Sequence, residues 1–257
     1  MTDISTLRAY LSRNRFMPEP PAELLYIGDG DYRAIGAEFL ERLVRDADLR
    51  TDDRVLDLGC GVGRLAMTMT QFLLDGTYDG VDPVPAGIAW CAATISPVYP
   101  NMQFHHIDLR HPLYNPQGAL DTAKTRLPFP DGSFDVISMI SVLTHLEQPE
   151  ALHYAAEAAR LLAPGGRCFA TAFLMNPPAR AALHERRGPL AFEPGESGPI
   201  YFAIKDAPLA AVAFDEDVLL ELFLRQGLRR RTPAYYGTWS GRAGQSFQDI
   251  CVFDKAA

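Results

Sequence analysis

The stretch Arg54–Ala66 has the sequence RVLDLGCGVGRLA, in which β-favouring residues lead into an acid, then a glycine-rich turn, then a helical pattern. The turn contains Gly59, Gly61 and Gly63. Glycine allows the backbone angles of a sharp strand-to-helix turn and removes the Cβ atoms that would hold a ligand away from the backbone. The stretch therefore predicts a buried parallel strand, a turn and a helix that together bind a nucleotide-like cofactor.

The spacing of this turn distinguishes two kinds of cofactor. A dinucleotide fingerprint is G-x-G-x-x-G, and it places a pyrophosphate on the helix N-terminus. Here the pattern is D-x-G-x-G-x-G, and Asp57 stands two residues before the first glycine. An acid at that point repels phosphate and suits a cationic group. The pattern therefore argues against a NAD-type oxidoreductase, which remains the alternative enzyme class.

Strand-like and helix-like segments alternate after the turn. Asp82 ends a second strand, in TYDGVDPV, nineteen residues after Gly63, and nucleotide-binding folds use an acid there to accept the ribose hydroxyls. A third strand is predicted at Met102–Ile107 and a fourth within Phe134–Leu146. The segment Arg160–Phe173, RLLAPGGRCFATAF, predicts the end of a helix, a Pro-Gly-Gly turn and a fifth strand. Such alternation predicts a parallel sheet with helices on both faces.

The helices and the last strands follow from apolar periodicity and from their end signals. The predicted helices are Ile4–Leu11, Asp31–Ala47, Leu65–Leu74, Pro85–Ile95, Pro149–Leu162 and Asp215–Gln226. Two strand-like runs come last, Leu228–Tyr236 and Phe247–Phe253, joined by a glycine-rich connection. They predict a hairpin, so one strand should run antiparallel at the edge of the sheet.

The five segments from the glycine turn to the fifth strand resemble, in residues and intervals, the motifs of the class I S-adenosylmethionine (SAM)-dependent methyltransferases. The resemblance implies one domain over residues 1–257 with a Rossmann-like α/β fold. That fold has a seven-stranded sheet, mostly parallel with one antiparallel edge strand, and helices on both faces. The resemblance also implies SAM as the cofactor and S-adenosylhomocysteine (SAH) as its product.

The resemblance assigns roles to residues near the ends of the strands. In the family, the glycine turn lies against the amino-acid end of SAM, the acid before it holds the ammonium group, and the acid after the third strand receives the adenine amino group. The ribose acid and the segment after the fourth strand complete the site. The residues expected to bind the cofactor are Asp57, Gly59, Cys60, Gly61, Gly63, Asp82, Pro83, Asp108, Leu109, Ile140, Ser141 and Gly28.

Residues 1–30 are expected to form a segment that covers the cofactor, because related enzymes fold such a segment over the methionine end of SAM. It contains YIGDGDY at Tyr26–Tyr32, where two glycines surround an acid. Tyr26 and Tyr32 could offer aromatic faces to the sulfonium. An equally good interpretation is a plain turn that leads to Asp31 as the N-cap of the following helix.

Two proline-rich insertions interrupt the alternation, His111–Ser133 and Leu174–Ala213. Both are too long for ordinary crossover loops. Ligands of open α/β sheets bind beyond the carboxyl ends of the strands, and the second insertion leaves the fifth strand at that end. We therefore interpret residues 174–213 as a lid that binds the acceptor, with a surface elaboration that touches no ligand as the alternative.

His145 is the candidate catalytic residue, because it follows the fourth strand on the side where the acceptor should lie. Methyl transfer from a sulfonium is an in-line displacement, so the protein chiefly supplies alignment. A general base is needed for a hydroxyl or a protonated amine, and imidazole titrates in the suitable range. A packing role is the alternative, since many proteins that resemble this family carry a histidine there. Packing is also the favoured role of His105 and His106.

The overall composition limits the partners. The chain has 24 basic and 32 acidic residues, a net charge of −8, and its only dense basic clusters, at Arg186–Arg187 and Arg229–Arg231, are too short for a nucleic-acid stripe. No apolar run approaches a membrane span, and no secretory signal is recognisable, so a cytoplasmic location is expected. The four cysteines are scattered in apolar segments, which predicts buried free thiols and no metal site.

These observations favour a SAM-dependent methyltransferase with a small-molecule acceptor and no nucleic-acid or membrane partner. O-methylation is slightly preferred, because of His145 and because the chain resembles bacterial natural-product tailoring enzymes. The segment Ser138–Ser141 lacks the N/D-P-P-Y pattern of enzymes that methylate nucleobase or glutamine amino groups. The alternatives are an N- or C-methyltransferase of a natural product, and a SAM-binding protein without catalysis, because cofactor motifs report binding and not turnover. The oligomeric state stays open.

Overall fold

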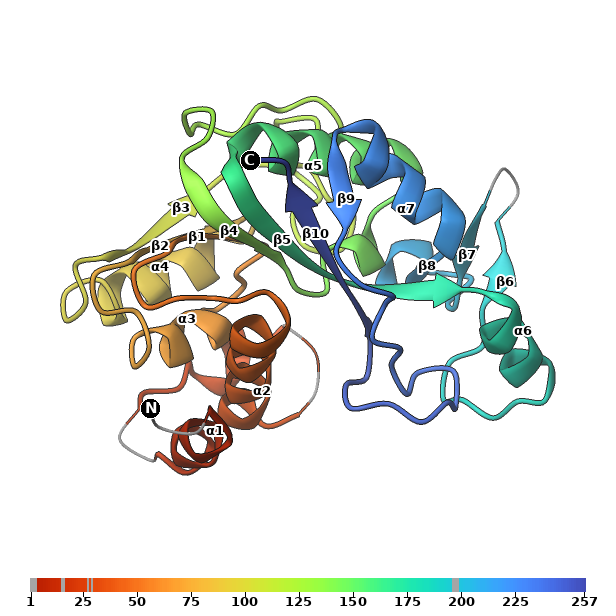
Figure 1. The fold of residues 1–257 in the computed structure, drawn as a ribbon, viewed down its shortest axis with the longest axis horizontal. Coiled ribbons are helices and arrows are strands. Elements are labelled where there is room, and N and C mark those ends of the chain that lie inside the picture. Colours follow the sequence, from red (N-terminus) through yellow and green to blue (C-terminus); the bar gives the residue numbers. More distant parts are fainter. Residues whose placement is uncertain (1–3, 15–16, 27, 29, 196–198) are drawn as a thin grey trace.

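The computed structural model describes residues 4–14, 17–26, 28, 30–195 and 199–257, which form a twisted sheet with helices on both faces (Figure 1). Seven strands appear in the order β3-β2-β1-β4-β5-β10-β9, and β10 runs antiparallel to both of its neighbours. These strands are β1 (Arg54–Leu58), β2 (Thr77–Asp82), β3 (Met102–His106), β4 (Phe134–Met139), β5 (Leu162–Met175), β9 (Leu228–Arg230) and β10 (Asp249–Lys255). The predicted fold class is confirmed. The short β9 pairs with the far side of the antiparallel β10.

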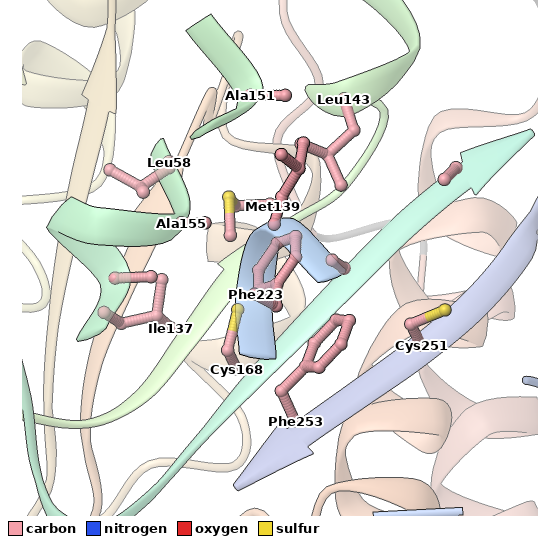
Figure 2. Close-up of a cluster of buried hydrophobic side chains, with 14 of the residues drawn as sticks. Leu58, Ile137, Met139, Leu143, Ala151, Ala155, Cys168, Phe223, Cys251 and Phe253 are labelled. Carbon is pink, nitrogen blue, oxygen red and sulfur yellow. The ribbon is translucent and has the colours of Figure 1, made fainter. Parts of the chain in front are cut away.

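Alternation of side chains along the strands creates two apolar layers. Val55 of β1 faces a core with α1 (Ile4–Arg13), α2 (Tyr32–Asp46), α3 (Arg64–Met69) and α4 (Pro85–Thr94). Leu56 and Leu58 face the opposite core, under α5 (Gln148–Leu161) and α7 (Glu216–Arg225). Figure 2 shows part of this second core, where the rings of Phe223 and Phe253 stack with centroids 4.1 Å apart. Both faces of the central strands are buried, as a parallel sheet requires.

Three elements differ from the predicted boundaries. The strand expected at Leu228–Tyr236 ends at Arg230, before a bend that contains Pro233, and Tyr235 forms only an isolated bridge with Ile250. The helix expected at Leu65–Leu74 ends at Met69, because the hydroxyls of Thr68 and Thr70 donate to carbonyls three residues earlier and compete with the helical pattern. The Pro-Gly-Gly sequence at 164–166 lies inside β5 rather than before it. It forms an irregularity in which two residues of β4 match five of β5, with Gly165 at φ +75°.

The second insertion adds strands to the sheet, which the sequence did not reveal. Its elements are α6 (Pro177–His184), β6 (Glu193–Pro194), β7 (Ile200–Phe202), the 3-10 helix η3 (Pro208–Ala210) and β8 (Val212–Asp215). β8 pairs in parallel with the end of β5, and β7 and β6 follow in antiparallel order, which gives ten strands in the described residues. Figure 1 shows α6 and β6 at the opposite end of the sheet from β3.

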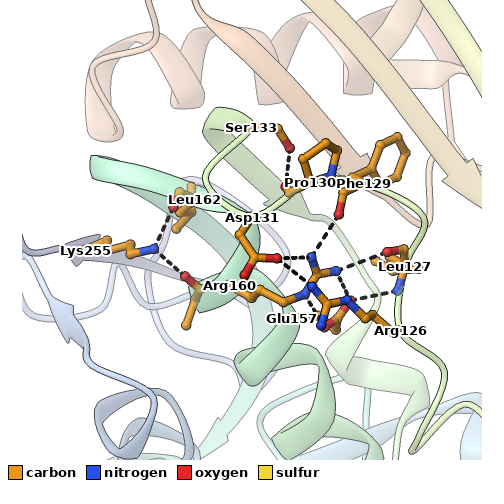
Figure 3. A network of polar contacts seen from close by, with 11 residues as sticks. Arg126, Leu127, Phe129, Pro130, Asp131, Ser133, Glu157, Arg160, Leu162 and Lys255 are labelled. Carbon is orange, nitrogen blue, oxygen red and sulfur yellow. Dashed lines mark hydrogen bonds and ion pairs between the residues drawn. The ribbon is translucent and has the colours of Figure 1, made fainter.

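The first insertion is fastened to α5 by one arginine (Figure 3). Arg160 donates to the carbonyl oxygens of Leu127 and Phe129, 3.1 and 2.8 Å away, and pairs with Glu157 at 2.6 Å and Asp131 at 2.8 Å. Glu157 in turn accepts a hydrogen bond from the Leu127 amide. The insertion therefore has a fixed path toward the carboxyl ends of the strands.

Replacement of Arg160 by alanine is expected to lower the free energy of unfolding by about 2–3 kcal/mol, because several charge-assisted hydrogen bonds lose their donor. Arg126 is the matched control, since it pairs with the same Asp131 at an exposed position, where ion pairs contribute about 0–1 kcal/mol. Urea unfolding of Arg160→Ala and Arg126→Ala measures both. Equal effects of the two substitutions would contradict the role given to Arg160.

Candidate functional site

The glycine turn after β1 is tied to the end of β2. The amides of Gly59 and Cys60 donate to the Val81 carbonyl at 2.8 and 3.0 Å. Gly59, Gly61 and Gly63 have φ values of +74°, +57° and +74°, in the region that favours glycine. A Cβ on Gly59 would lie 2.6 Å from Val142, so the turn packs directly against the segment after β4. The three glycines therefore form the strand-to-helix turn that the sequence predicts.

Asp57 lies buried at the foot of the turn. Its two carboxylate oxygens accept hydrogen bonds from the hydroxyls of Ser138 on β4 and Tyr78 on β2, each at 2.6 Å. Burial raises the pKa of Asp57 from 3.8 to about 6, against the opposing effect of these hydrogen bonds. Burial therefore disfavours the charged form of this carboxyl, and a nearby cation would stabilise that form.

Asp82 ends β2 directly beside the turn. One carboxylate oxygen accepts from the Gly61 amide at 2.8 Å, and the other accepts from the Val84 amide at 2.9 Å and from the Tyr26 hydroxyl at 3.3 Å. The side chain is buried, which raises its pKa. One oxygen of the carboxylate thus already accepts a hydrogen bond from a hydroxyl group, that of Tyr26. The carbonyl of the next residue, Pro83, accepts a hydrogen bond from a ring nitrogen of His106.

Asp108 and Leu109 follow β3 at the same edge of the sheet. The Asp108 carboxylate accepts from the Asn115 side chain at 2.9 Å and from the Ala119 amide at 3.1 Å, and the Asn115 bond is the main cause of its lowered pKa. Leu109 is buried, and it forms an isolated bridge with Leu120. Both residues therefore organise the start of the first insertion as well as the edge of the candidate cofactor site.

A polar group joins the ends of β4 and β5. Ser141, which follows Ile140, has φ +59° without being glycine, and such backbone strain concentrates at functional sites. Its amide donates to the Thr171 hydroxyl at 2.7 Å, and its own hydroxyl donates to the Gln248 side-chain oxygen at 3.1 Å. Thr171 donates to that same oxygen. No local sequence pattern predicts the role of Thr171 or Gln248, because their partners lie 30 or more positions away.

Both ring nitrogens of His145 have partners. His145 ends a 3-10 turn, η2 (Leu143–His145), and its Nδ1 is 2.8 Å from the Leu209 carbonyl oxygen. Its Nε2 is 3.1 Å from the Tyr114 hydroxyl. Since a carbonyl only accepts, Nδ1 carries the hydrogen, and Nε2 is the basic nitrogen that accepts from Tyr114. Burial lowers the pKa of His145, so the neutral ring predominates at pH 7.

The N-terminal segment contributes one side chain to this edge. The ring of Tyr26 reaches Asp82 as described and lies 6.2 Å, between centroids, from the ring of Tyr114. Tyr32 is buried beneath the glycine turn, with its hydroxyl donating to the Val62 carbonyl at 2.8 Å. Asp31 caps α2 by accepting from the Ala34 amide. Residues 1–3, 15–16, 27 and 29 of the predicted cofactor-covering segment lie outside the described residues.

His105, His153 and the four cysteines have structural surroundings. His105 bonds to Asp79 at 2.7 Å, and His153 bonds to the Thr125 carbonyl at 2.8 Å. The cysteines are buried and free, as predicted: Cys60, Cys91, Cys168 and Cys251. Among the described residues, no group of three or more His, Cys, Asp and Glu side chains is suited to a metal ion. Within the same part of the chain, no helix is long and apolar enough to cross a membrane.

Solved structures share this fold across most of the chain. A protein from Pyrococcus horikoshii OT3 aligns with a TM-score of 0.61 and 17% identity, over 90% of this chain and 94% of its own. The Burkholderia thailandensis 1,6-didemethyltoxoflavin-N1-methyltransferase, solved with bound 1,6-didemethyltoxoflavin and SAH, aligns with a TM-score of 0.55 and 18% identity, over 99% of this chain and 87% of its own. At these identities the likeness shows the fold alone.

Sequence comparison shows the family. The family model described as a methyltransferase domain matches residues 29–198. The 27-O-demethylrifamycin SV methyltransferase of Amycolatopsis mediterranei is 31% identical over 137 residues, which cover 53% of this chain and 44% of that protein. The chain therefore spans less than half the length of this curated relative. Given the D-x-G-x-G-x-G turn, the acid after β2 and the matched domain, the chain belongs to the class I SAM-dependent methyltransferase family.

Proposed function

We propose that the chain is an enzyme that transfers the methyl group of SAM to a hydroxyl oxygen of a small molecule. The observation that carries this proposal is the state of His145, whose Nδ1 hydrogen is held by the Leu209 carbonyl and whose basic Nε2 already accepts a hydroxyl group, that of Tyr114. A base of this kind is needed for a hydroxyl acceptor. The name of the rifamycin relative, which specifies a 27-O position, supports the same reaction type.

The residues at the strand ends fit the parts of SAM. In this proposal the backbone of Gly59, Cys60, Gly61 and Gly63 lies against the amino-acid end of SAM, and Asp57 is a buried carboxylate that a cation stabilises. Asp82 accepts a hydroxyl hydrogen now, from Tyr26, as it would from the ribose. In this proposal Pro83 borders the ribose, Asp108 and Leu109 border the adenine, and Ile140, Ser141 and Gly28 border the methionine end.

The chemistry places few demands on the protein. SAM supplies a methyl group that is bonded to a sulfonium sulfur. When the methyl group is transferred, this sulfur becomes the neutral thioether of SAH. The acceptor hydroxyl displaces the Tyr114 hydroxyl from His145 Nε2 and gives its proton to that nitrogen as the new carbon–oxygen bond forms. The Nδ1 hydrogen bond to the Leu209 carbonyl then stabilises the imidazolium. The main contribution is alignment of the two reactants.

The acceptor site in this proposal lies beside the ends of β4 and β5. Ser141, Thr171 and Gln248 offer hydroxyl and amide groups there, and the net charge of −8 disfavours a polyanion. Residues 174–213 act as the lid. Val212 and Ile200 of this segment belong to the main core, and Leu209 of η3 contacts His145. A fixed surface elaboration remains the alternative for this segment.

A SAM-binding protein without catalysis is the second candidate. The observation that favours it is that each ring nitrogen of His145 is satisfied within the protein, as expected for a packing residue. N- or C-methylation of a natural product is a further alternative, because an unprotonated amine or electron-rich carbon needs no base.

Incubation with SAM that carries a ¹³C-methyl group and a bacterial small-molecule extract tests the proposal. Mass spectrometry detects any labelled product, and the ¹³C chemical shift of the transferred methyl distinguishes oxygen, nitrogen and carbon as the acceptor atom. A methyl on oxygen is the expected result. Labelled N- or C-methyl products would contradict it, and SAM binding without any product or SAH across varied extracts would favour the non-catalytic candidate.

The substitution Asp82→Asn is expected to weaken SAH binding about tenfold to a hundredfold, because the ribose hydroxyls lose a charged acceptor and such bonds contribute about 1.5–3 kcal/mol. Isothermal titration calorimetry measures the change. Asp79→Asn is the matched control on the same strand, since Asp79 pairs with His105 away from the turn. Unchanged SAH affinity in Asp82→Asn would contradict the assignment.

SAH affinity is expected to depend on pH through Asp57, whose pKa burial raises to about 6. The charged form attracts the ligand's ammonium, so affinity should be full above about pH 6 and fall up to tenfold per unit below it. Folding stability has the opposite sign: the raised pKa contributes stability below 3.8 that is lost as the pH rises through about 6. Calorimetric titrations from pH 5 to 7.5 should show a weaker dependence in Asp57→Asn than in wild type.

The substitution His145→Gln is expected to lower kcat by about 10²-fold or more, the contribution typical of a positioned base. SAH affinity should change little, because the ring lies on the acceptor side. His153→Gln is the control, since His153 bonds to a carbonyl outside the site. Kinetics are measured with the acceptor that the labelling experiment identifies. A kcat within twofold of wild type would leave His145 as a packing residue.

A further inference from the structure

Arg64 is a half-buried arginine directly after the glycine turn, and its guanidinium is poorly satisfied. Arg64 is the first residue of α3, next to Gly63. Its Nη2 donates to the Gly28 carbonyl at 3.1 Å, while its buried Nε has no hydrogen-bond partner. The described residues provide no ion pair to Arg64. Burial lowers its pKa, as expected where no anion offsets the loss of water.

Other arginines that are shielded from solvent have a carboxylate partner. The pairs are Arg42 with Asp46 at 3.3 Å, Arg160 with Glu157 at 2.6 Å and Arg167 with Asp53 at 2.5 Å. Arg33 also has a buried Nε without a hydrogen bond, yet the same atom forms an ion pair with Glu19 at 2.9 Å. A buried charge without a partner is costly, so the surroundings of Arg64 are suited to an anion that binds from outside.

The position of Arg64 limits which anion that is. Its backbone continues the glycine turn, and its guanidinium contacts Gly28 of the N-terminal segment. The methionine end of SAM, which lies against such a turn in this family, carries an ammonium and an α-carboxylate. Asp57 is an anion on one side of the turn and suits the ammonium. Arg64 is a cation directly after the turn, with its guanidinium on the Gly28 carbonyl, and the carboxylate requires a cation.

We propose that the guanidinium of Arg64 binds the α-carboxylate of SAM and SAH. An arginine presents parallel N–H groups that match a carboxylate in two hydrogen bonds. Binding in this way gives the Nε hydrogen an acceptor and gives the charge a counter-ion. The inference rests on SAM as the cofactor and is independent of the acceptor, of O-methylation and of His145.

Two ligands that differ in one group test the proposal. Decarboxylated SAM keeps the adenosine, the sulfonium and the amine, and it lacks only the carboxylate. In Arg64→Gln, SAM affinity should fall about tenfold to a hundredfold, as expected for loss of a charged hydrogen-bonding partner. Affinity for decarboxylated SAM should stay within about twofold of the wild-type value. Calorimetry on the full chain measures both constants and involves no methyl transfer, so failure of the proposed activity would not affect the result.

The controls separate binding from structure. Arg33→Gln removes the other arginine with a buried Nε, whose counter-ion is Glu19, and it should leave the preference for SAM unchanged. Arg64→Lys keeps the charge without the parallel donors, so it should show an intermediate preference, and it replaces Arg64→Gln if that variant does not fold by thermal melting. Equal losses for both ligands would mean that Arg64 only supports Gly28. That result, or an unchanged preference for SAM, would overturn the proposal.

Discussion

The buried carboxylate of Asp57 is the constraint on which the cofactor edge of the sheet depends. A charge inside the protein is costly unless hydrogen bonds satisfy it, and here the donors are Tyr78 on β2 and Ser138 on β4. One side chain therefore links three adjacent strands. In the ladder, Asp57 is opposite Gly80 of β2 and Ser138 of β4. Because the register is set beside this residue, Asp82 after β2 and Val142 after β4 both reach the glycine turn.

A second buried aspartate has the same role on the other half of the sheet. Asp249 of β10 is fully buried and accepts from the amides of Leu174 and Gly237, from the Trp239 indole and from Arg242. These groups belong to β5 and to the connection before β10. Gln248 is its neighbour in the chain, so the same anchor sets the place of Gln248 beside Ser141. The two halves of the site are thus positioned by two buried carboxylates, each held by hydrogen bonds from more than one segment.

The sequence was sufficient where function is encoded by short spacing. The glycine turn, the acid that ends β2 and the alternation of strands and helices depend on neighbouring residues, and the structure confirms them. It was insufficient where the partners are distant. Tyr114 and Leu209 lie 31 and 64 positions from His145, and no local pattern relates them. The strands within 174–213 escaped for a similar reason: they are two to four residues long, and they join the sheet through the pairing of β8 with the distant β5.

The contact between Leu209 and His145 joins two parts of the proposed mechanism. Leu209 belongs to η3, within the proposed lid, and its carbonyl fixes the tautomer of the proposed base. A carbonyl cannot be replaced by changing the side chain, so the basic nitrogen is defined by the backbone path of the insertion. If η3 moves away, the Nδ1 hydrogen loses its acceptor, and an imidazolium at His145 loses its main stabilisation. In the proposed mechanism, closure of the segment and readiness of the base are therefore the same event, and proton removal is confined to the closed state.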